Sequence, residues 1–154
     1  MCDDFYEGAY LPKNNNKILM CSNTLMNQSD FDNALQRQLI LMYDNVRGGG
    51  RHDLNNCKHL ACSEVRAALF NDQCKVKQST VEMLRGSHEG EKLDAQKYCF
   101  RNIAVNHLKE KQRCADKSEQ YIDYVFEQCL KDKSPFTSAG GKKARLVSIS
   151  EKLI

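Results

Sequence analysis

The stretch HLACSEVRAA, residues 59–68, has the apolar spacing of a helix that faces a protein core. The apolar side chains at helical spacing are Leu60, Ala61, Val65, Ala67, Ala68 and Leu69. Asp53 precedes the pattern as a candidate N-cap, so we expect a helix from about residue 54 to 70, with Glu64 inside it.

A second helix is expected over residues 30–46, after Ser29 as N-cap and before the Gly48-Gly49-Gly50 run. Its segment from Leu39 to Tyr43 is apolar on nearly every side, which predicts a central helix buried on several faces.

The remaining pattern is mostly helical. We expect helices near residues 76–85, 92–112 and 118–131, the last two packed as an antiparallel pair. Short extended runs at residues 9–11 and 17–21 flank the Asn14-Asn15-Asn16 turn and give the only β signal. The expected fold class is therefore mainly α with a small N-terminal β-hairpin, an α+β protein.

Length and composition limit the function classes. A chain of 154 residues with 41% hydrophobic and 28% charged residues is typical of one soluble globular domain, not of a collagen-like or disordered chain. We expect this domain over residues 1–136, and a partner-docking tail over 137–154, after Pro135. A net charge of +3 is too weak to indicate nucleic-acid binding. The longest apolar stretch is too short to span a bilayer, so membrane contact is expected to be peripheral.

Eight cysteines are unusual in a chain of this length. No C-x2-C pair occurs, which argues against a zinc ribbon and against thioredoxin-type chemistry. Disulfides are favoured over free core cysteines, and they indicate an oxidising compartment. The N-terminus, MCDDFYEGAY, has neither an apolar signal region nor the arginines of a transit peptide. Together these features favour the mitochondrial intermembrane space.

Residues 59–68, followed by Cys74, resemble the signature of the mitochondrial inner-membrane ATP-synthase-processing metallopeptidases. The resemblance extends over roughly residues 8–136, up to Pro135-Phe136. It implies a zinc-peptidase-like fold on the intermembrane-space side of the inner membrane, and a role in assembly of the ATP synthase membrane sector. It also implies an inherited disulfide framework of Cys21, Cys62, Cys74, Cys99 and Cys129.

The family's active-site helix carries H-E-x-x-H before a Tyr-Asp or Phe-Asp pair, and Tyr43-Asp44 sets that register here. The resemblance then places Arg37 and Leu41 at the ligand positions and Gln38 at the general-base position. A guanidinium stays protonated, leucine has no lone pair, and a glutamine amide cannot accept the proton of a metal-bound water. The sequence therefore predicts a degenerate site without catalytic residues, metal or cofactor, in a protein that is not an enzyme.

Two polar residues remain near the lost site. Glu64 matches a plausible third-ligand position, and we expect it to pair with Arg37 in preference to being solvated. His59, beside a helix start, is expected to be a surface or capping residue, not a ligand.

The cysteine pattern departs from the family, because Asp44-Asn45-Val46-Arg47 lacks the cysteine of the usual Asp-His-Cys-Arg. Cys57 and Cys114 are candidate replacements. Eight cysteines allow 105 pairings. We prefer a bridge from Cys99 or Cys114 to Cys129, which would link the last two helices.

The function expected from these features is a non-catalytic structural or accessory subunit of an inner-membrane complex, either ATP synthase or the respiratory chain. Its partners would be protein subunits, through which it associates with the membrane. An alternative is a transient assembly chaperone that binds extended chains at the strand near Ile18 to Cys21. A rewired hydrolase that uses His52, His59, Glu64 or a cysteine is the least favoured hypothesis.

Overall fold

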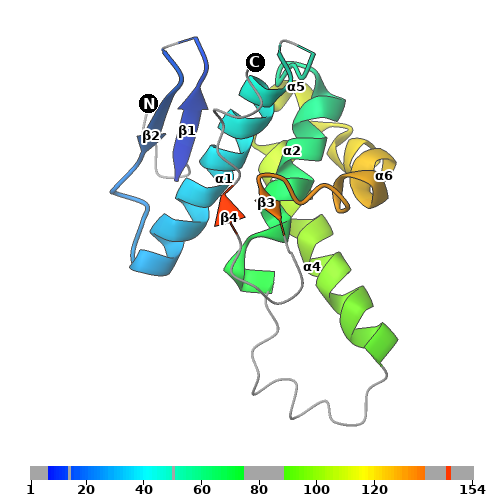
Figure 1. Ribbon diagram of the computed structural model, residues 1–154. Coiled ribbons are helices and arrows are strands. Elements are labelled where there is room, and N and C mark those ends of the chain that lie inside the picture. The colour runs from blue at the N-terminus through cyan, green and yellow to red at the C-terminus, as the bar shows by residue number, and fades with distance from the viewer. Residues whose placement is uncertain (1–6, 14, 50, 75–88, 138–144, 147–154) are drawn as a thin grey trace.

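The structure is a computed structural model that describes residues 7–13, 15–49, 51–74, 89–137 and 145–146 (Figure 1). A hairpin lies along one flank of helix α1, and helices α2, α4 and α6 lie on the other side of α1 (Figure 1). The expected fold class, mainly α with a small N-terminal hairpin, is confirmed.

The hairpin consists of β1 (Gly8–Leu11) and β2 (Lys17–Met20), which pair antiparallel from Gly8 opposite Met20 to Leu11 opposite Lys17. The turn between them places Asn15 and Asn16 in the left-handed region, with φ of 57° and 54°. Asparagine tolerates this conformation better than most residues, so the asparagine run marks the turn as expected.

Two helices start at asparagine caps that differ from the expected ones. Helix α1 runs Gln28–Arg47 and is capped by Asn27, whose side chain accepts from the Asp30 N–H, so Ser29 lies inside the helix. Helix α2 runs Cys57–Leu69 and is capped by Asn56, which accepts from the N–H groups of Lys58 and His59. Asp53 instead accepts from Asn55 in the preceding turn.

The later elements follow the predicted pattern with shifted ends. A short 3-10 helix, η1 (Asp72–Cys74), precedes α4 (Glu89–Lys109), α5 (Gln112–Ala115) and α6 (Ser118–Cys129). A second strand pair joins β3 (Phe136–Thr137), at the boundary between the expected domain and tail, with β4 (Arg145–Leu146) in the tail. The helix expected over 76–85 lies outside the described residues.

The central helix is α2, and the prediction of a central α1 is wrong. Helix α2 contacts α1, α4 and α6, and its Ala61, Val65 and Ala68 are fully buried. Helix α1 contributes only Leu41 to the main core cluster, while Leu39 is 42% exposed. Among the described residues, the apolar far side of α1 has no helix packed on it, whereas α2 is enclosed by three.

Three disulfides connect the helical layers. Cys57 at the start of α2 pairs with Cys114 in α5, Cys62 in α2 pairs with Cys129 at the end of α6, and Cys74 pairs with Cys99 in α4. Cys21 is also disulfide-bonded, and no described cysteine is free.

The preferred bridge from Cys99 or Cys114 to Cys129 is wrong. Helices α4 and α6 do pack antiparallel, with ion pairs of Lys97 with Glu127 and of Arg101 with Asp123 along the outer side of their contact. The cysteine-bearing faces of both helices turn instead toward α2 and η1, which carry the partner thiols.

No helix among the described residues combines the length and apolarity needed to cross a bilayer.

Removing one disulfide should lower the free energy of unfolding by an amount that depends on the number of residues between its two cysteines. Cys62 and Cys129 are 67 residues apart, so replacing both by alanine should lower the free energy of unfolding by about 4 kcal/mol, chiefly by freeing the unfolded chain. The Cys74→Ala/Cys99→Ala variant, with a separation of 25, should lose about 0.9 kcal/mol less. Urea unfolding of the oxidised proteins measures both, and equal stability of variant and parent would contradict the prediction.

Candidate functional site

The α1–α2 interface contains the residues that the sequence singles out. Arg37 and Leu41 lie one helical turn apart on α1 and share the face that points to α2 and the core. Glu64 comes from α2 and has no exposed surface. A carboxylate in such surroundings needs a cation or several hydrogen-bond donors.

Arg37 supplies that cation through a two-point contact. Its Nε donates to Glu64 Oε2 and its Nη2 to Glu64 Oε1, both at 2.9 Å. Nη2 also donates to Glu110 Oε2 at 3.0 Å, and lies 3.5 Å from the carbonyl oxygen of His107. The expected pairing of Glu64 with Arg37 is therefore present, and the guanidinium ties α1 to both α2 and the end of α4.

Both groups remain charged over a wide pH range. Burial by itself would raise the pKa of Glu64, but the guanidinium of Arg37 and the imidazole of His107 outweigh it and lower this pKa to about 2. Burial opposes the charge on Arg37 too, but the carboxylates of Glu64 and Glu110 hold the pKa of Arg37 above its usual value.

Gln38 and Leu41 turn to other neighbours. The Gln38 side chain is buried, and its Nε2 donates to the carbonyl oxygen of Gly8 in β1 at 3.3 Å. A Cβ at Gly8 would lie 2.7 Å from the Leu19 carbonyl oxygen, so glycine allows the close strand pairing at this place. Leu41 packs in the main core cluster.

Sequence reasoning missed His107, which is the imidazole nearest to Glu64. Its Nδ1 lies 3.3 Å from Glu64 Oε2, but it is buried and makes no well-formed hydrogen bond. The sequence signal is weak, since it consists only of a histidine one helical turn before Glu110 near the end of α4.

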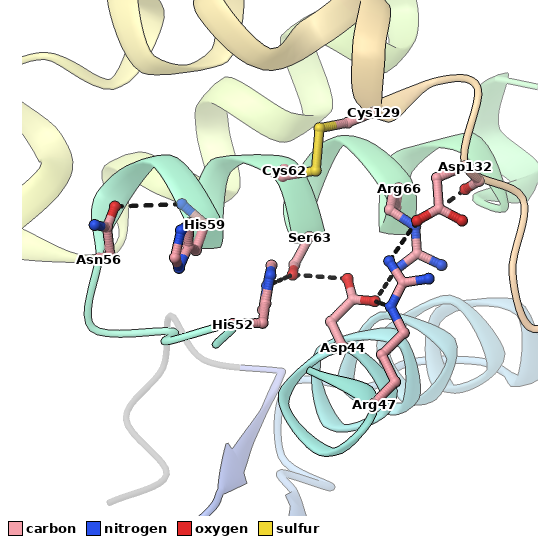
Figure 2. Close-up of a disulfide and its surroundings, with 10 residues drawn as sticks. All are labelled: Asp44, Arg47, His52, Asn56, His59, Cys62, Ser63, Arg66, Cys129 and Asp132. Carbon is pink, nitrogen blue, oxygen red and sulfur yellow. Dashed lines mark hydrogen bonds and ion pairs between the residues drawn. A yellow bond between two sulfur atoms is a disulfide. The ribbon is translucent and has the colours of Figure 1, made fainter. Parts of the chain in front are cut away.

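A second polar network lies further along α2 (Figure 2). Ser63 Oγ donates to Asp44 Oδ2 at 2.7 Å and lies 2.8 Å from His52 Nε2, so the ring nitrogen must donate to Oγ. Arg66 is fully buried, pairs with Asp44, and donates from Nε to the Asp132 carbonyl oxygen at 3.0 Å. This network binds the loop before α2 and the segment after α6 to the helix.

The two histidines of the rewired-hydrolase hypothesis serve this network. The rings of His52 and His59 stack with centroids 5.1 Å apart, and His59 Nδ1 accepts from the Asp53 N–H at 3.0 Å. Burial and the neighbouring His59 lower the pKa of His52. Ser63 is fully buried, and its hydroxyl donates a hydrogen bond to Asp44. Ser63 and His52 therefore do not form an exposed nucleophile with a general base.

The resemblance implies zinc, and the side chains at this place do not fit it. Zinc in proteins takes lone pairs from thiolates, imidazoles or carboxylates, usually with three or four such ligands. Arg37 and Leu41 have no lone pair to offer. Over the described parts of the chain, no group of three or more His, Cys, Asp or Glu side chains could hold a metal ion.

Two cavities flank the Arg37 position. One of about 150 Å³ is lined by polar residues that include Asp30, Asn33, Arg37 and His107. The other, of about 220 Å³, is lined by Gln38 and Leu41 of α1 and by Tyr10 of β1. The chain thus has two cavities along α1, one lined by Arg37 and the other by Gln38 and Leu41.

The profile of the Peptidase M76 family matches residues 1–137. The proteins named "Mitochondrial inner membrane protease ATP23" from Yarrowia lipolytica and Eremothecium gossypii are 29% and 30% identical to this chain, each over 88% of it and over 52% and 53% of their own length. The protein of the same name from Mycosarcoma maydis is 31% identical over 81% of this chain and 56% of its own. The chain thus spans about half the length of these relatives. No solved structure matches it.

These comparisons correct one expectation. The sequence predicts a protein that is not an enzyme, and that prediction is wrong, because the matched family and the similar proteins are named as peptidases and point to an enzyme.

Replacing only one partner of the buried Arg37–Glu64 ion pair should strongly destabilise the folded protein. Glu64→Gln leaves a buried guanidinium with only Glu110, whose side chain is 32% exposed, so the free energy of unfolding should fall by about 3–5 kcal/mol. The double variant Arg37→Met/Glu64→Leu should recover most of this loss, since no buried charge remains. Asp123→Asn, which breaks the exposed pair with Arg101, is the matched control and should cost under about 1 kcal/mol. Urea unfolding measures all three, and equal losses for Glu64→Gln and Asp123→Asn would contradict the argument.

The lowered pKa of Glu64 predicts a stability loss in acid. A carboxyl whose pKa falls from 4.5 to about 2 on folding stabilises the protein above pH 4.5, and this contribution disappears as the pH falls from about 4.5 to about 2. The parent protein should therefore lose stability over this window more steeply than Glu64→Gln does. Unfolding free energies at several pH values between 6 and 2 would measure the two slopes, and parallel slopes would refute the assignment.

Proposed function

This chain belongs to the Peptidase M76 family, and from that premise we propose that it works at the mitochondrial inner membrane, on the intermembrane-space side, as an accessory protein of ATP synthase. The observation that carries the proposal is the family match over residues 1–137, together with similar proteins that are named for the inner membrane. A respiratory-chain complex is the alternative partner.

The disulfides support the compartment. Three disulfides join α2, η1, α4, α5 and α6, and such bonds persist in oxidising spaces and are rare where glutathione keeps thiols reduced. An oxidising space that borders the inner membrane fits both the disulfides and the names of the relatives.

The surface beside α1 supports a role in binding polypeptides. The hairpin is a two-stranded sheet, and no strand of the described residues pairs with its outer edge, which suits an extended partner. The two cavities beside Arg37 and Gln38 lie along the same side of the domain as β1, since Glu7 lines one of them and Tyr10 lines the other.

A second candidate is a transient assembly factor that leaves before the complex is complete. The available hairpin edge favours it, because strand addition is a common way to hold an extended, unassembled chain for a limited time. The fixed-subunit and the transient roles use the same surface and differ in how long the partner stays.

Co-migration on native gels separates these roles. A tagged full-length chain in mitochondria should comigrate with ATP synthase, in stoichiometric amount with the mature complex if it is a fixed subunit, or only with assembly intermediates if it is transient. A chain that migrates alone in every fraction would refute the proposal, and comigration with a respiratory complex alone would replace the partner. A peptide-cleavage assay on the same purified sample reports separately on the enzymatic activity to which the family points.

A further inference from the structure

The cavity of about 220 Å³ combines an apolar floor with a polar rim. It lies between the hairpin, α1, the loop before α2 and the start of α5. Leu41 and Leu60 are buried beneath it, and the half-buried Leu54 forms a wall. Sites for drug-sized molecules run from about 300 Å³ upward, so this volume suits one amino-acid residue. Its lining therefore favours an apolar side chain.

The rim of the cavity is cationic. Lys111 lines it and forms no ion pair with any described residue. Arg113 lines it too, held in place because its Nη2 donates to the Leu54 carbonyl oxygen at 2.7 Å. Asp53 is the one carboxylate in the lining, and it accepts from the N–H and Nδ2 of Asn55 at 2.8 and 2.9 Å. Two cations against one occupied carboxylate leave a net attraction for an anion.

Gln38 adds a specific acceptor. Its side chain is 3% exposed, and its Nε2 is committed to the Gly8 carbonyl oxygen. Its Oε1 receives no hydrogen bond from the described residues, although the residue lines the cavity. This oxygen keeps accessible surface, so a ligand that brings an N–H to the cavity replaces water as its hydrogen-bond donor.

We propose that this cavity binds the C-terminal residue of a partner polypeptide that ends in an apolar residue. The ligand side chain packs on Leu41, Leu54 and Leu60. Its free carboxylate lies at Lys111 and Arg113, and its main-chain N–H donates to Gln38 Oε1. The inference rests on the proposed binding role and names the part of the partner that is bound.

The three features together exclude other ligand classes that share one of them. A fatty acid has the apolar chain and the carboxylate but no N–H for Gln38. An internal acidic residue has the N–H and a carboxylate, but its side chain cannot also fill the apolar floor. A chain end places an apolar side chain, an amide N–H and a carboxylate on one residue, whereas a free amino acid carries a cationic ammonium group in place of the amide.

Short labelled peptides test the proposal with the purified, oxidised full chain. A hexapeptide of alanines ending in leucine, with a fluorophore at its N-terminus, should bind as a free acid and bind about tenfold more weakly as the C-terminal amide. Replacing the last leucine by serine should weaken binding by a similar factor. Fluorescence anisotropy measures all three. Equal binding of acid and amide, no binding of the acid, or displacement by octanoate as effective as by unlabelled peptide would each overturn the assignment.

Variants locate the binding in this cavity. Lys111→Glu should weaken binding of the free acid by about tenfold or more and abolish the preference over the amide. Lys131→Glu makes the same charge change outside the cavity lining and should leave binding unchanged. Equal effects of the two variants would overturn the assignment. Failure of the peptides to bind, with comigration on native gels intact, would refute this inference alone, whereas loss of comigration refutes the proposed function.

Discussion

Two buried charges of opposite sign lie two residues apart on α2, and the packing of α1 depends on both. Glu64 and Arg66 have no exposed surface, and each finds its partner on α1, Arg37 for the carboxylate and Asp44 for the guanidinium. A buried charge without its partner costs several kcal/mol. Sliding α1 along α2 by one turn would leave both charges unmatched, so the two pairs fix how the helices are placed against each other.

This placement decides which neighbours Gln38 and Leu41 contact. With Arg37 turned into the α2 interface, its neighbour Gln38 must point toward the hairpin, where it bonds to Gly8, and Leu41 enters the core. The Asp44 end of the interface extends through Ser63 to His52 and so holds the loop that carries Asp53 and Leu54. The wall of the larger cavity is therefore built by the same polar contacts that hold α1 on α2.

The sequence predicts the helices from local pattern, and the family resemblance predicts the Arg37–Glu64 contact because it places both residues at metal-ligand positions. Helical spacing is a property of neighbouring residues, and a buried carboxylate strongly constrains which cation lies near it. The central position of α2, the partner of each cysteine and the role of His107 depend on how distant helices face one another. The apolar segment from Leu39 to Tyr43 predicts burial on several faces, but Leu39 is exposed. Periodicity shows which surface is apolar, but it does not show whether another element covers that surface.

The family match and the side chains of the α1 site support different expectations about activity. The peptidase family points to an enzyme, while Arg37 and Leu41 cannot coordinate zinc, since neither side chain offers a lone pair. Hydrolysis by this chain would therefore have to use other groups than the residues at those two positions. At this place the described residues bring together the carboxylate of Glu64 and the imidazole of His107, beside a polar cavity. Kinship thus identifies the family, whereas the reaction depends on the side chains that occupy the site in this chain.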